Sequence, residues 1–101
     1  MKKRVATRLV EMASVMFPET PILPSAADVL ADERLVQEAL EALPQLSPTI
    51  ENVLASLPLD PNQAVVALGE MDAKSVYAVT TVITGSYFLA PEVQAGLARL
   101  G

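Results

Sequence analysis

The side chains that could do chemistry in this chain are almost all carboxylates. The sequence has twelve Asp and Glu residues but no histidine and no cysteine, so it lacks the usual general base, a thiol nucleophile and the main ligands of zinc and haem. No spacing pairs the carboxylates for acid–base catalysis, since Glu33 and Glu41 fall with Gln37 on the outward stripe of an expected helix. We therefore predict that the chain is not an enzyme by itself and holds no catalytic, cofactor or metal site.

The charge of the chain argues against nucleic acid as a partner. Seven Lys and Arg against twelve Asp and Glu give a net charge of −5, and three of the seven basic residues are Lys2, Lys3 and Arg4. A protein that binds the phosphate backbone needs a basic patch instead.

The length of 101 residues predicts one domain, residues 1–101, with one modest core. Hydrophobic residues make up 51% of the chain but aromatic residues only 4%, so the core should consist of Ala, Val and Leu. A small chain of this composition should also carry apolar surface that it cannot cover alone.

Proline and helix-capping residues divide the chain into about five or six helical pieces, and no segment alternates as a strand does. We therefore predict an all-α fold. The first helix should end at Phe17, because the following proline disfavours helical geometry in the residue before it. Later helices should start after residues with good capping side chains, which are Ser25, Ser47, Asp60 and Asp72.

Residues 18–24 include three prolines and should form an extended connection across the surface. Such a segment can serve as a docking strap for another protein. The alternative is a plain connector that Ile22 and Leu23 hold against the core.

Residues 75–91 contain no charged side chain. A helix that is apolar or small on every side must be surrounded by its own domain or by another protein. The stretch is about as long as the shortest membrane-spanning helices, but its Thr, Ser and Tyr residues favour a buried helix over a membrane span. Ala78, Thr81 and Gly85 should line a groove of small residues that receives another helix of the same domain or, as the alternative, a partner.

The N-terminus has some features of a signal peptide, with basic residues 2–8 before apolar residues 9–17. Glu11 interrupts the apolar part, and the segment has the pattern of an amphipathic helix. We therefore expect no signal peptide and a cytoplasmic location. A periplasmic location is the alternative if the chain is exported with a partner or is given in its mature form.

Two parts of the sequence carry a family resemblance: Met16-Phe17-Pro18 at the end of the first helix, and Tyr87-Phe88-Leu89-Ala90-Pro91-Glu92-Val93 after the uncharged helix. With the acidic, leucine-rich middle of the chain, this order resembles the gluconate 2-dehydrogenase subunit 3 family. These proteins are small helical subunits of flavin-dependent sugar and alcohol dehydrogenases.

The resemblance implies an accessory role. In this family the FAD and the acid–base residues belong to a large subunit of the glucose-methanol-choline oxidoreductase type, often with a cytochrome subunit as electron acceptor. We therefore expect a non-catalytic small subunit that binds the large flavoprotein subunit and supports its folding or stability. The residues predicted to contact the partner are Ile22, Leu23, Ala78, Thr81, Gly85, Tyr87, Phe88, Pro91, Val93 and Leu97.

Two other functions fit the same sequence. The chain could be a stand-alone helical scaffold that homo-oligomerises through its apolar faces, or a carrier of an apolar ligand between its helices. For Tyr87 and Phe88, packing in the core is the alternative to partner contact.

Overall fold

The computed structural model describes the backbone of residues 2–99 and the side chains of residues 5–99. Within this range it contains seven α-helices and a short 3-10 helix, and no strand, which confirms the all-α prediction. The α-helices are α1 (Lys2–Met16), α2 (Ala26–Val29), α3 (Arg34–Ala42), α4 (Ser47–Ser56), α5 (Pro61–Gly69), α6 (Ala73–Leu89) and α7 (Pro91–Ala98). The 3-10 helix η1 (Pro44–Leu46) leads directly into α4.

Three of the four predicted capping residues start a helix as expected. The side chains of Ser25, Asp60 and Asp72 each accept a hydrogen bond from a backbone N–H in the first turn, at 2.9 to 3.3 Å. The prediction for Ser47 is wrong, because α4 already includes Ser47 and its cap is Leu46, which makes no side-chain bond. The preceding 3-10 turn continues into α4 and leaves Ser47 inside the helix.

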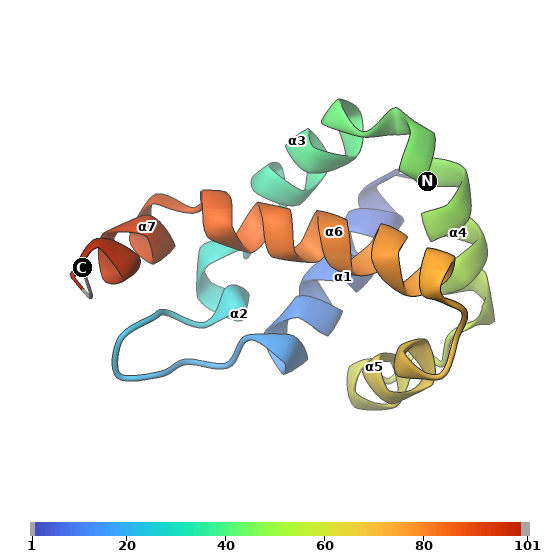
Figure 1. Ribbon diagram of the computed structural model, residues 1–101, viewed down its shortest axis with the longest axis horizontal. Helices are drawn as coiled ribbons and strands as arrows, with labels where there is room; N and C mark the ends of the chain where they lie inside the picture. The colour runs from blue at the N-terminus through green and yellow to red at the C-terminus, as the bar shows by residue number, and fades with distance from the viewer. Residues whose placement is uncertain (1, 100–101) are drawn as a thin grey trace.

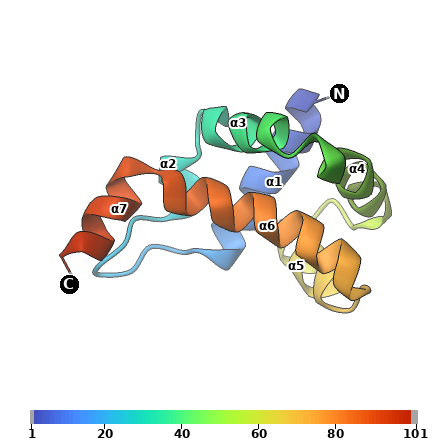
Figure 2. The same ribbon diagram turned by 45° about the horizontal axis from the view of Figure 1, so that its top comes forward.

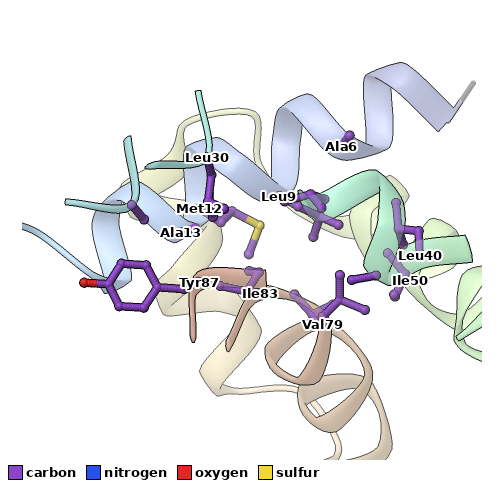
Figure 3. Close-up of a cluster of buried hydrophobic side chains, with 14 of the residues drawn as sticks. Ala6, Leu9, Met12, Ala13, Leu30, Leu40, Ile50, Val79, Ile83 and Tyr87 are labelled. Atoms are coloured by element: carbon purple, nitrogen blue, oxygen red, sulfur yellow. The ribbon is translucent and has the colours of Figure 1, made fainter. Parts of the chain in front are cut away.

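The core lies between α1 and α6, which cross near the centre of the molecule (Figures 1 and 2). Both helices also contact α3, α4 and α5. In Figure 3, Leu9 and Met12 of α1 lie opposite Val79, Ile83 and Tyr87 of α6. Leu30, Leu40 and Ile50 close the core from the shorter elements and are also buried. The core thus depends on aliphatic packing around one long helix.

Helix α6 is covered by its own domain on one side only. Its buried residues are Ala78, Val79, Val82, Ile83, Ser86 and Tyr87. The opposite side exposes Tyr77, Gly85, Phe88 and Leu89, and its one charged side chain is that of Lys74 in the first turn. Part of the uncharged helix is therefore not surrounded by the described part of the chain.

A guanidinium joins the first helix to the middle of the chain. Arg8 of α1 donates hydrogen bonds to the carbonyl oxygens of Leu54, Leu57 and Pro58, at the C-terminal end of α4. The C-terminal end of a helix carries a partial negative charge, which a nearby cation stabilises. Arg8 therefore suits this position and fixes the end of α4 and the two residues after it against α1.

None of the described helices has the combination of length and hydropathy that crossing a bilayer requires.

Candidate functional site

The proline loop, residues 18–24, connects α1 to α2 and lies beside α7 at one end of the molecule (Figure 1). It is irregular, as its prolines predict. The Thr20 hydroxyl accepts hydrogen bonds from the N–H groups of Ile22, at 3.2 Å, and Leu23, at 2.9 Å. A backbone bond of 2.9 Å from Thr20 N–H to the Leu23 carbonyl closes the same turn. The loop therefore has a defined conformation of its own.

Three aromatic rings attach the proline loop to the end of α6. Phe17 stacks on Tyr87 with ring centroids 4.3 Å apart, and Phe88 meets both rings edge-on, at 5.9 Å from Phe17 and 5.3 Å from Tyr87. The Tyr87 hydroxyl donates a 2.6 Å hydrogen bond to the Pro24 carbonyl. Both ends of the loop are thus held by residues of one aromatic cluster.

Tyr87 belongs to the core and not to the surface. Its side chain is 1% exposed, and burial raises the pKa of its hydroxyl above the ordinary value. Ala78 and Val93, which were also predicted as partner contacts, are buried as well. Side chains so covered have no surface to offer, so we assign these three residues to the packing of the domain.

Helix α7 approaches the proline loop at Gly96. A Cβ atom at this position would lie 2.7 Å from the carbonyl oxygen of Ile22 and 2.8 Å from the Cδ2 atom of Leu23. Only a residue without a side chain permits so short a distance between helix and loop. Gly96 was not singled out from the sequence, because nothing local distinguishes it from any other helical glycine.

Gly85 has the opposite environment. A Cβ atom at this position would meet no atom within 4 Å, and the residue is exposed. No helix of the described chain therefore packs at Gly85, and the prediction of a groove filled by the domain itself is wrong there. Ala78 is buried and Thr81 half-buried, so the three small residues do not form one continuous groove.

The loop–α7 surface consists of the exposed apolar residues at this end of the molecule: Ile22, Phe88, Leu89, Pro91 and Leu97. Ile22 is 45% exposed, Phe88 37% and Leu97 39%. Leu23 is half-buried. The other large exposed apolar residues lie toward the opposite end of α6 and are Leu59, Val66 and Tyr77. The predicted contact residues Ile22, Phe88, Pro91 and Leu97 thus remain exposed in the proline loop, at the end of α6 and in α7.

A cleft of about 490 Å³, largely open to solvent, lies between the proline loop and α7. Residues 19–24 form one of its walls, and Glu92, Ala95 and Arg99 of α7 form another, while Asp28 completes the lining. Within residues 2–99 no cluster of carboxylates could hold a metal ion. Comparison with family models, curated proteins and solved structures gave no match.

Proposed function

We propose that this chain is a non-catalytic small subunit that binds and stabilises the FAD-containing catalytic subunit of a sugar or alcohol dehydrogenase. The observation that carries the proposal is the loop–α7 surface, where exposed apolar side chains lie on a braced framework. The identity of the partner rests on the resemblance of residues 16–18 and 87–93 to the small subunits of such enzymes.

The braced framework favours binding. The aromatic cluster, the Thr20 turn and the contact at Gly96 fix the proline loop in the free chain. A preordered surface loses less conformational entropy when a partner binds, so more of the energy of apolar burial remains as affinity. Phe88 is suited to the centre of such an interface, because aromatic side chains often contribute most of the binding energy.

In this proposal the flavin and the acid–base groups belong to the partner. The small subunit covers apolar surface of the catalytic subunit. A protein that binds only the folded state of its partner shifts the partner's folding equilibrium toward that state. Loss of the small subunit should therefore lower the solubility or flavin content of the catalytic subunit.

Purification of the chain from its own cell tests this proposal. An affinity tag should be placed at the N-terminus, because α1 begins at the end of the molecule far from α7 (Figure 1). We expect a stoichiometric partner several times larger than this chain, with the absorption spectrum of a flavin. A colourless eluate that holds this chain alone would contradict the proposal.

A second candidate is self-association as a helical scaffold, favoured by the exposed apolar residues on the open side of α6. Tyr77 is exposed there and Gly85 leaves room for a neighbouring backbone. Light scattering on the purified chain separates the candidates, since a defined symmetric oligomer without a partner supports the scaffold.

A further inference from the structure

The cleft beside α7 has walls of fixed position. The Tyr87 hydroxyl holds the carbonyl of Pro24, the Thr20 hydroxyl holds the turn at residues 20–23, and Gly96 sets the distance between α7 and the loop. A cleft with fixed walls can select a segment of given size and charge, because little reorganisation accompanies binding.

The lining of the cleft combines carboxylates with apolar groups. Glu19, Asp28 and Glu92 contribute three negative charges and Arg99 one positive charge, which leaves a local charge of −2. Among residues 5–99, the salt bridges are those of Arg34 with Asp32 and Glu38. The carboxylates of the cleft are therefore not neutralised by ion pairs within the described part of the chain.

The lining also has an apolar part. It consists of Ile22, Leu23 and the two prolines of the loop, and of Ala95 of α7. An occupant that matches both features needs an aliphatic group for the walls and a positive charge near the carboxylates.

From this complementarity we infer that the cleft binds a segment of another protein in which a Lys or Arg residue stands next to an aliphatic residue. The inference rests on the proposed function in one respect, that the segment belongs to the catalytic subunit. The cleft then contributes specificity and association rate, and the loop–α7 surface contributes most of the buried apolar area.

A short capped peptide, acetyl-Gly-Leu-Lys-Leu-Arg-Gly-amide, tests the chemistry without the partner. Titration into the isotopically labelled full chain should shift the amide NMR signals of residues 19–24 and of α7, and these shifts should weaken as salt is raised. The same peptide with Glu in place of Lys and Arg should cause no such shifts. Absence of binding by the basic peptide, equal binding by the acidic one, or shifts centred elsewhere would overturn the inference.

Two charge-reversal variants of equal net charge locate the site. Glu92→Lys should weaken binding of the basic peptide roughly five-fold, the effect of turning one exposed ion pair from attraction to repulsion. Glu41→Lys is the matched control, since Glu41 is exposed on α3 outside the cleft lining, and should change the affinity less than two-fold. Circular dichroism of both variants checks the fold, and equal affinities would overturn the inference.

The results separate this inference from the proposed function. If a flavoprotein co-purifies with the chain but the basic peptide does not bind, the cleft inference fails and the proposed function stands. If the peptide binds in the cleft but no flavoprotein co-purifies, the preference for a basic segment stands and its assignment to a catalytic subunit fails.

Discussion

Replacement of Gly96 by alanine should destabilise the protein, whereas the same replacement at Gly85 should stabilise it. Both residues lie within helices and neither has a positive φ angle. Alanine at either position therefore has the same local advantage, since it restricts the unfolded chain more than glycine does. The two positions differ in what the new methyl group meets.

The magnitude follows from these environments. Glycine is about 1 kcal/mol less favourable than alanine inside a helix, so Gly85→Ala, with no atom within 4 Å of the new methyl group, should gain up to that amount. At Gly96 the methyl group would lie 2.7 Å from the carbonyl oxygen of Ile22. Overpacking of this kind costs about 1–3 kcal/mol. The helix contribution is similar in both variants, so their difference in stability is about the cost of overpacking.

Urea unfolding followed by circular dichroism measures this difference directly. Gly85→Ala should exceed Gly96→Ala in the free energy of unfolding by about 1–3 kcal/mol, and its Tm should be higher by about 4 °C or more. Gly69→Ala is a further control, because its methyl group would also meet no atom within 4 Å. If Gly96→Ala were as stable as Gly85→Ala, α7 would not pack closely on the proline loop and the description of the cleft would be refuted.

Three further predictions concern the contacts that fix the helices. Arg8→Met should lower the free energy of unfolding by about 1–2 kcal/mol in urea titrations, because it removes the donor to three carbonyls at the end of α4; an unchanged midpoint would contradict this role. Tyr87→Phe should cost about 1 kcal/mol near neutral pH through loss of the bond to Pro24. Burial raises the pKa of the Tyr87 hydroxyl in the folded protein. The stabilisation of the wild type is therefore fully present below the unfolded pKa of about 10 and is lost as the pH rises through the folded pKa. The free energy of unfolding of the Phe variant should fall less steeply between about pH 9 and about pH 11, and parallel curves for the two proteins would contradict burial of the hydroxyl. Hydrogen bonds from Ser75 lower the pKa of Asp72, so its cap stabilises above about pH 4 and is lost as pH falls through the lowered pKa; Asp72→Ala should lower the Tm at pH 7 but not in strong acid, and an equal deficit at both would contradict the cap.

The helices could be predicted from local chemistry. Prolines ended α1 and began α7, and short polar side chains at Ser25, Asp60 and Asp72 marked other helix starts. These signals act within one helical turn, so a sequence displays them directly. The prediction that Ser47 caps a helix was wrong because a 3-10 turn precedes it. Whether such a turn forms depends on the packing of its surroundings.

The candidate site could be predicted only in outline. The proline loop and the end of α6 were both expected to take part, but composition cannot tell an apolar residue of the core, such as Tyr87, from one on the surface, such as Leu97. The role of Gly96 depends on residue 22, and that of Arg8 on residues 54–58. Such contacts between distant segments leave no periodic pattern in a single sequence.

The most direct test of the central claim compares two variants in the purification of the tagged chain. Leu97→Glu places a charge on the loop–α7 surface, and Leu59→Glu places the same charge at the opposite end, where the side chain is 81% exposed. Partner recovery and flavin absorbance are measured for each variant against the wild-type chain. The account predicts that Leu97→Glu loses the flavoprotein while Leu59→Glu retains it. Equal recovery by both variants, or no flavoprotein with the wild-type chain, would contradict it.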